Sequence, residues 1–186
     1  MAQDSRARFY VTTPQQGREA PFVYESDGRF LQRLGREGEG PGEYEYPGTM
    51  LVTRGDTIHV LDQRARRLTV LSPSFEVVRT VPGMPGTGAI LQLPNGHYVA
   101  NNAHTGHPLR LLDKSGRALR GFGEGSEVMD PYSGWRNGRA LALSRRGGFW
   151  SAVRLSRHII EHWTEDGLKT LEIKPQSDWH FPFDQL

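Results

Sequence analysis

The sequence predicts an all-β fold of repeated four-stranded units, and three observations support this prediction. An extended apolar run reaches a tight polar turn and then resumes as a second run at four places in the chain. The four turn centres are 47, 41 and 51 residues apart, at Asp27, Ser74, Ser115 and Asp166. The chain is also rich in turn formers, with 22 glycines and 12 prolines, which suits many short strands. A period in the forties with strand chemistry throughout is typical of β-propeller blades.

Each repeat divides into runs that we expect to be strands. The first unit, about 7–35, is partial, because it lacks an innermost strand and offers only 8–12, 21–25 and 29–34. The second unit is the most regular and spans about 48–82, with a hairpin turn at Gly55-Asp56 and strands at 48–54, 57–62, 67–72 and 75–81. The third unit spans about 88–123, with strands at 89–93, 97–101, 109–113 and 117–122. The fourth spans about 138–174, with strands at 139–144, 149–154, 158–163 and 168–173.

Apolar doublets interrupt the strand alternation, for example Leu51-Val52 and Val77-Val78. A sheet that is stacked between two neighbouring sheets buries both faces, which explains such doublets. We therefore expect a single β-propeller domain over 1–186, made of blades of four antiparallel strands. At about 45 residues per blade the chain holds about four units. A closed ring of four blades is allowed, but the partial first unit and the tail 175–186 indicate an open part of a larger ring, which needs further blades or self-association to close.

Composition excludes several classes of partner and chemistry. The net charge is +2, and the 20 arginines and 3 lysines are interleaved with 21 acidic residues, so we expect no nucleic-acid partner. The chain has no cysteine, which removes disulfides, thiolate nucleophiles and cysteine-based zinc sites. No apolar run approaches the ~18 residues of a membrane span, so none is expected. The first ten residues have no apolar signal-peptide core, and the compartment remains open.

The segment 34–78 resembles an NHL-type repeat and, more closely, the bacterial six-bladed β-propeller proteins. The similarity rests on a glycine-rich run, a hairpin turn, an Asp after the second strand and an Arg that begins the third; the matching residues are Gly35, Gly38, Gly40, Pro41, Gly42, Glu43, Pro47, Gly55, Asp56, Asp62 and Arg67. The resemblance implies a rigid six-bladed ring with a central channel, of which this chain holds about four blades as an open part. Such proteins are mostly bacterial and often exported. Known functions in such proteins range from binding scaffold to channel enzyme, so the fold does not settle the function.

Six of these residues are expected to be structural, at turns or between blades: Gly35, Gly40, Pro41, Gly42, Asp62 and Arg67. The glycine-rich run lacks the Gly-Lys-Ser/Thr of a phosphate-binding loop, and its glutamates would repel a phosphate. We expect it to be a linker between blades, in which glycine permits positive φ. Asp62 and Arg67 are expected to form an ion pair or to cap a turn, with a ligand-lining role as the alternative.

The best candidate site is the connection between the second and third strands of the third unit. Asn101, Asn102, His104 and His107 offer oxygen and imidazole ligands for a divalent metal or a polar ligand, although loop polarity alone also explains such a cluster. Arg154 occupies the matching place in the fourth unit. Trp135, in the long loop 126–138, is a candidate contact residue.

The segment 158–162 spells the H-x-x-E-H signature of a class of zinc peptidases, with His158, Glu161 and His162. That chemistry needs a helix, whereas this segment aligns with strands. On a strand the two histidines are about 13 Å apart, too far for one metal ion. No metal site is therefore assigned to it.

We predict a non-catalytic binding or scaffold protein that recognises a protein or a small polar ligand through its rim loops, with no cofactor. The alternative is a metal-dependent channel enzyme, a lyase or hydrolase, with a divalent metal held by side chains from several blades. RNA binding is a third reading, which the interleaved charges disfavour.

Overall fold

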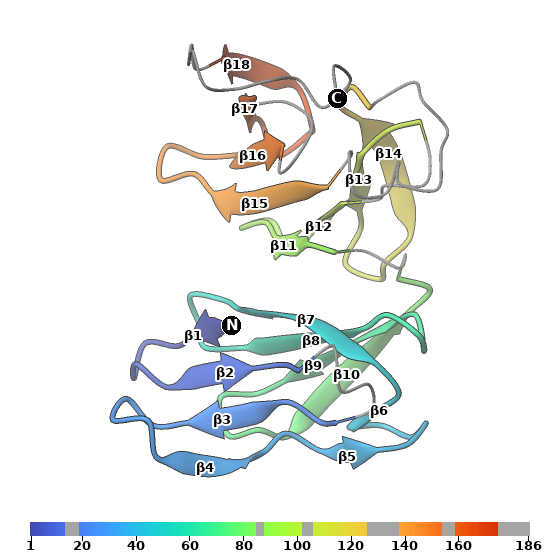
Figure 1. The fold of residues 1–186 in the computed structure, drawn as a ribbon. Coiled ribbons are helices and arrows are strands. Elements are labelled where there is room, and N and C mark those ends of the chain that lie inside the picture. The colour runs from blue at the N-terminus through green and yellow to red at the C-terminus, as the bar shows by residue number, and fades with distance from the viewer. Residues whose placement is uncertain (14–18, 85–87, 102–105, 126–137, 154–158, 175–186) are drawn as a thin grey trace, which may run out of the picture. The chain divides into compact units, whose positions relative to one another are not determined.

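The computed structural model describes residues 1–13, 19–84, 88–101, 106–125, 138–153 and 159–174. These residues form strands and turns, and none of them belongs to a helix, so no helix capable of crossing a membrane is found among them. The strands make four antiparallel sheets of four strands each. The chain divides into two compact units, Met1–Gly86 and Thr87–Leu186, with two sheets in each (Figure 1).

The first unit contains sheets one and two. Sheet one holds β1 (Ala2–Gln3), β2 (Phe9–Val11), β3 (Phe22–Tyr24) and β4 (Phe30–Arg33), in that order. Sheet two holds β7 (Pro47–Val52), β8 (Ile58–Asp62), β9 (Arg67–Leu71) and β10 (Val77–Pro82). In the sequence between these two sheets, β5 (Arg36–Glu37) and β6 (Glu43–Tyr44) form a short parallel pair.

Strand β1 corrects the prediction that the first unit is partial, at about 7–35. Ala2 and Gln3 pair with Tyr10 and Phe9 of β2, so the first sheet has four strands. Ala2 and Gln3 are too short a segment to show the alternation of apolar and polar residues that marks a strand, so the sequence did not indicate β1.

The second unit contains sheets three and four. Sheet three holds β11 (Ile90–Gln92), β12 (Tyr98–Asn101), β13 (Leu109–Leu112) and β14 (Ala118–Phe122). Sheet four holds β15 (Arg139–Leu143), β16 (Phe149–Val153), β17 (Ile160–Trp163) and β18 (Lys169–Ile173). All twelve strands of sheets two to four lie within one or two residues of the predicted ranges, and the predicted all-β architecture of four-stranded blades is confirmed.

The repeated turn that indicated the fold has one geometry in all four sheets. In each case the residue at the left-handed position donates its backbone N–H to the carbonyl three residues earlier: Gly28 to Glu25, Phe75 to Ser72, Gly116 to Asp113 and Gly167 to Thr164, at 2.9–3.0 Å. Their φ angles lie between 72° and 86°. The strand register shifts beside each turn, as a three-residue loop with a bulge requires.

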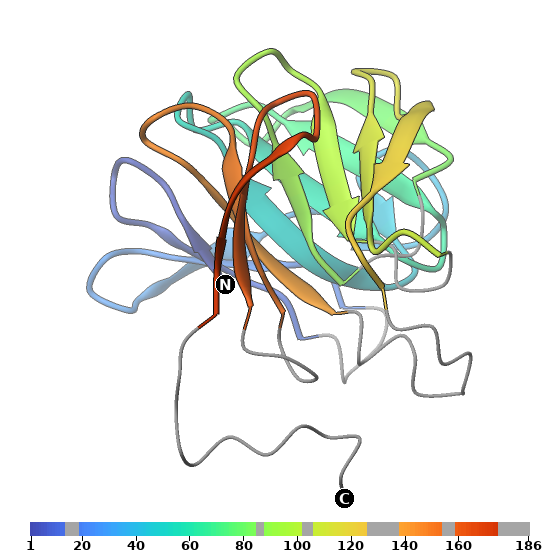
Figure 2. The ribbon, with the colours of Figure 1, turned by 90° about the horizontal axis from the view of Figure 1, so that it is seen from above.

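Each unit has a core where its two sheets face one another. In the first unit Tyr10 and Val23 pack with Ile58, Val60 and Leu71. In the second, Val99, Leu109 and Phe122 pack with Phe149 and Trp163. All five residues of β8 are buried, whereas most of β10 is exposed. The first strands of the paired sheets meet, β1 beside β7 and β11 beside β15, so the last strands form the outer part of each sheet (Figure 2).

Candidate ligand-binding site

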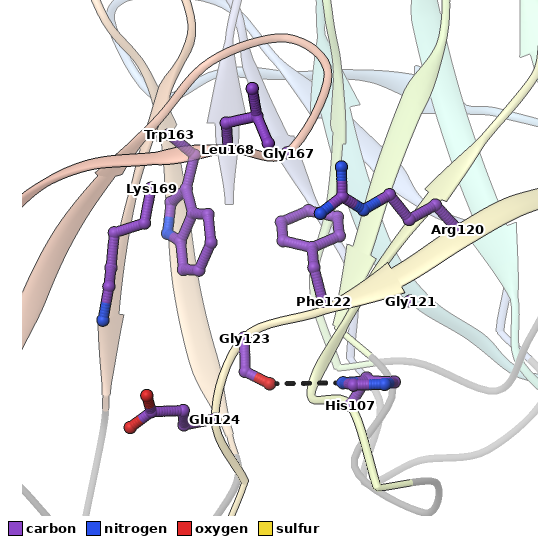
Figure 3. A pocket seen from close by; sticks show the side chains of 10 residues that line it. All are labelled: His107, Arg120, Gly121, Phe122, Gly123, Glu124, Trp163, Gly167, Leu168 and Lys169. Atoms are coloured by element: carbon purple, nitrogen blue, oxygen red, sulfur yellow. Dashed lines mark hydrogen bonds between the residues drawn. The ribbon is translucent and has the colours of Figure 1, made fainter.

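A pocket lies in the second unit between sheets three and four. Its volume is about 330 Å³, and two segments form most of its wall. The first is 120–124, at the end of β14, and the second is 163–169, which carries the turn from β17 to β18. His107, which precedes β13, completes the wall (Figure 3).

The floor of the pocket is aromatic. The rings of Phe122 and Trp163 meet edge to face, with their centroids 5.1 Å apart, and each residue is 4% exposed. The Trp163 indole N–H donates to Ser151 Oγ at 3.0 Å, and this hydrogen bond fixes the orientation of the ring. Leu168 lies at the mouth, 54% exposed.

Glycines make room for the side chains that line the pocket. A β-carbon at Gly121 would lie 3.0 Å from the imidazole of His107, so the absence of a side chain lets that ring rest on β14. His107 Nδ1 lies 3.4 Å from Gly123 O. Gly167 has a φ of 75°, and a β-carbon there would lie 3.1 Å from the Phe122 ring. The β17–β18 turn therefore approaches β14 closely, and its backbone forms one wall of the pocket.

Charged groups surround the aromatic floor. Arg120 donates through Nη1 to the carbonyl oxygen of Asp166 at 3.2 Å, which holds the guanidinium beside the β17–β18 turn. Lys169 Nζ lies 2.5 Å from a Glu172 carboxylate oxygen and 3.6 Å from Glu161 Oε1. The hydrogen bond to Glu172 raises the pKa of Lys169, so the ammonium is retained at neutral pH. Arg120 and Glu124 lie at opposite ends of the floor in Figure 3.

Behind the pocket, Glu161 is buried among polar partners. Ser151 Oγ donates to Glu161 Oε2 at 3.1 Å, and Arg139 Nη2 lies 4.0 Å from the same oxygen. Arg139 is itself buried, and its Nη2 also donates to the Glu124 carbonyl at 2.8 Å. A buried carboxylate requires such partners, because desolvation otherwise outweighs the attraction of a single opposite charge. The network fixes the base of the pocket.

The predicted ligand cluster contributes one residue to this pocket. His107 lines it, whereas Asn101 is 4% exposed and takes part in structural bonds. Asn101 Nδ2 donates to Pro108 O at 2.8 Å, and its Oδ1 accepts from the Arg139 backbone N–H at 2.9 Å. Asn101 thus joins the end of β12 to the start of β15. The other four candidates lie outside the described residues: Asn102, His104, Trp135 and Arg154.

Asp62 and Arg67, at the corresponding connection of sheet two, bind the backbone. The Asp62 carboxylate is fully buried and accepts from the N–H groups of Glu45, Tyr46, Arg64 and Ala65, at 2.7–3.2 Å. Arg67 donates to the carbonyls of Gly38, Glu39 and Glu43. Both side chains therefore bind the glycine-rich run that links sheets one and two.

The glycines of that run meet close backbone contacts. A β-carbon at Gly35 would lie 1.9 Å from Gly42 O, and φ is 95° at Gly35 and 74° at Gly42. Gly40 N–H donates to Glu43 Oε2 at 2.8 Å, across the turn that contains the exposed Pro41. The Glu43 carboxylate therefore stabilises the turn within the glycine-rich run.

Residues 160–162 of the H-x-x-E-H segment lie in strand β17, which places neighbouring side chains on opposite faces. Glu161 faces the buried network, whereas His162 faces away from it, with Nδ1 2.6 Å from Thr170 Oγ1 and Nε2 3.0 Å from Gly147 O. His158 lies outside the described residues. Within the part of the chain that is described, no three His, Asp or Glu side chains gather as a metal site would require.

Sequence reasoning did not find Arg120, Phe122, Trp163 or Lys169 as site residues. They become neighbours because sheets three and four pack together, and no local pattern reports that contact. The one local signal was the Gly-Phe-Gly sequence 121–123, in which both flanking glycines leave space for the segment that precedes β13.

Comparison with known proteins agrees with this architecture. Residues 3–104 match the sequence pattern of the family described as 6-bladed beta-propeller. The chain belongs to this family. The match covers sheets one and two and part of sheet three, and the same four-stranded arrangement continues to the end of the described residues. No curated protein matches the sequence.

Solved structures with the same fold include three of different kinds. A protein of unknown function from Bacteroides caccae has a TM-score of 0.67 at 12% identity, over 93% of this chain and 59% of that one. Hydrazine synthase of Kuenenia stuttgartiensis has a TM-score of 0.63 at 8% identity, over 92% and 47%. Virginiamycin B lyase from Staphylococcus aureus has a TM-score of 0.58 at 12% identity, over 95% and 55%. At these identities the likeness shows the fold alone, and the chain spans about half the length of these proteins.

Proposed function

We propose that this β-propeller is a non-catalytic binding or scaffold protein that recognises a protein or a small polar ligand. The observation that supports it is the pocket at the junction of sheets three and four, with its aromatic floor and charged rim. A concave site with an apolar surface and a few directed polar groups is the usual form of a binding site. His107, which lines this pocket, belongs to the polar cluster that the sequence singled out.

The test is a screen of small polar compounds by chemical-shift perturbation on the isotope-labelled full chain. We expect binders whose shifts centre on the indole of Trp163 and the imidazole of His107. Arg120→Ala should weaken binding, while Arg117→Ala serves as the matched control, since Arg117 is exposed on the same hairpin and pairs with Asp113. Absence of any compound that perturbs the pocket would reject this function.

A metal-dependent enzyme is the second candidate, because proteins that share this fold include enzymes such as virginiamycin B lyase and hydrazine synthase. Under the binding proposal the protein holds no cofactor, whereas this alternative requires a divalent metal. Elemental analysis of the purified protein, with thermal unfolding in zinc, calcium and magnesium, separates the two. A stoichiometric metal and a metal-dependent rise in Tm would favour the enzyme.

A further inference from the structure

We propose that the pocket between sheets three and four binds a short peptide with free termini, with the peptide carboxylate at Arg120 and its ammonium at Glu124. This inference rests on the proposed binding function and specifies its ligand class. It follows from the charges at the two ends of the pocket, from their spacing and from the apolar surface between them.

Arg120 supplies the end that attracts an anion. Its one hydrogen bond is to a neutral backbone carbonyl, that of Asp166, and among the described residues no carboxylate lies within ion-pair distance of it. Its remaining N–H groups are therefore available to a carboxylate, which guanidinium binds in a bidentate manner. Lys169 does not compete for the anion, because its ammonium is bonded to Glu172 and also faces Glu161.

Glu124 supplies the end that attracts a cation. Its backbone carbonyl accepts from Arg139, but within the described part of the chain its carboxylate has no ion-pair partner inside bonding distance. Lys169 attracts this carboxylate at longer range while remaining bonded to Glu172. A ligand ammonium at Glu124 would gain an ion pair without having to displace an existing one.

The spacing of the two charges selects the length of the ligand. Arg120 and Glu124 are four residues apart, but β14 ends at Phe122 and the backbone turns at Gly123, whose φ is 84°, so the two residues are closer than the ~13 Å of four extended residues. Both side chains can lean inward from their α-carbons. An extended tripeptide spans about 10 Å between its termini, while the two charges of a single amino acid are much closer together. A tripeptide can therefore reach both ends of the pocket, whereas a free amino acid reaches only one.

The surface between the charges favours an apolar central side chain. Phe122 and Trp163 form this part of the floor, and Leu168 stands at its edge (Figure 3). Burial of a leucine-sized side chain against these groups adds affinity through the hydrophobic effect. The complementary ligand therefore carries a negative end, an apolar middle and a positive end.

The experiment titrates the full chain with Ala-Leu-Ala and monitors the Trp163 indole resonance. Two further probes are its N-acetylated form and its C-amidated form. We expect the unblocked peptide to bind with a Kd below about 1 mM, and each blocked form to bind about fivefold more weakly, as the loss of one exposed ion pair implies.

The variants Arg120→Gln and Glu124→Gln assign each terminus to its residue. Arg120→Gln should weaken the unblocked peptide about fivefold but leave the affinity for the C-amidated peptide unchanged. Glu124→Gln should weaken binding of the unblocked peptide about fivefold but leave the affinity for the N-acetylated peptide unchanged. Equal affinity of blocked and unblocked peptides, or no peptide binding, would overturn the inference. If other polar compounds still perturbed Trp163 in that case, the binding function would stand and only its ligand class would be wrong.

Discussion

Asp62 and Asn101 end the second strands of sheets two and three, and each uses its side chain differently. Asp62 offers two acceptor oxygens to four backbone N–H groups. Asn101 accepts from Arg139 N–H through its oxygen and donates to Pro108 O through its amide. An aspartate could not make the second bond, because an ionised carboxylate has no donor. Sheet two has Asp at this position because its partners are all N–H donors, whereas sheet three has Asn because one of its partners is a carbonyl acceptor.

Replacement of Asp62 tests its role in fixing the glycine-rich run. Asp62→Ala leaves four N–H groups without their acceptor, and we expect a loss of about 3 kcal/mol in the free energy of unfolding. Asp62→Asn keeps the oxygen that serves Tyr46, Arg64 and Ala65, so the expected loss is about half as large. Urea denaturation of both variants measures the difference, and equal losses would contradict the assignment.

His59 makes stability depend on pH. Burial in β8, with a smaller contribution from the positive charge of Arg79, lowers the pKa of His59 to about 4. The unfolded chain takes up this proton near pH 6.5, whereas the folded protein does not until pH 4. The free energy of unfolding should therefore fall by up to about 1.4 kcal/mol per unit as the pH drops from 6.5 to 4.

Urea denaturation of the wild type and of His59→Leu over this range checks the prediction. Carboxylates also lose stabilising interactions over this range, so the informative quantity is the difference between the two slopes. His59→Leu should have a shallower slope than the wild type. Identical slopes for the two proteins would show that His59 does not carry the effect.

At the scale of elements, the repeated hairpin could be predicted because its information is local. A turn needs a residue that tolerates positive φ at one position, and glycine supplies it in three of the four sheets. In the second sheet Phe75 adopts a φ of 72°, and its ring packs on Tyr10 and under the Arg8 guanidinium. Contacts with sheet one thus offset the strain in this turn.

Other elements could not be predicted, since their information is not local. Strands β5 and β6 contain two residues each, next to glycines that usually argue against a strand. Arg67 and Asp62, more than 15 residues away, hold this backbone in place: Arg67 donates to carbonyls within 38–43, and Asp62 accepts from the N–H groups of 45 and 46. The pocket likewise depends on the approach of 163–169 to 120–124, which only the packing of the two sheets brings about.

Two glycine substitutions separate backbone strain from close contact. Gly28 and Gly35 have similar φ angles of 86° and 95°, but a β-carbon at Gly28 meets nothing, whereas one at Gly35 would overlap with Gly42 O. Gly28→Ala should cost about 1 kcal/mol for the left-handed backbone alone. Gly35→Ala should cost at least 2 kcal/mol more, because β5 or the run must shift. Thermal unfolding of both variants measures the difference, and similar costs would contradict it.

At the scale of the molecule, sheet four carries large apolar side chains on both faces. One face packs on sheet three through Phe149 and Trp163. The other carries Ile160, Leu171 and Ile173, which pair or neighbour one another across β17 and β18 and remain 37–48% exposed. An exposed face of this kind favours association. We propose that a sheet from a second copy of the chain covers it.

This proposal predicts concentration-dependent self-association of the chain. The double substitution Leu171→Thr and Ile173→Thr should lower the average mass measured by sedimentation toward that of the monomer. Leu119→Thr is the control, because Leu119 is 45% exposed on the outer strand β14 rather than on this face. A monomeric wild-type protein at all concentrations would contradict self-association.

The bond between Asn101 and Arg139 has a consequence for synthesis. The two residues are 38 positions apart, so the ribosome releases β12 well before the amide N–H that its last side chain requires. Until Arg139 emerges, the Asn101 oxygen must remain hydrated. The third blade therefore reaches its final state only after translation of the fourth has begun. If translation paused between the two blades, the hydrogen bond between Asn101 and Arg139 could not form.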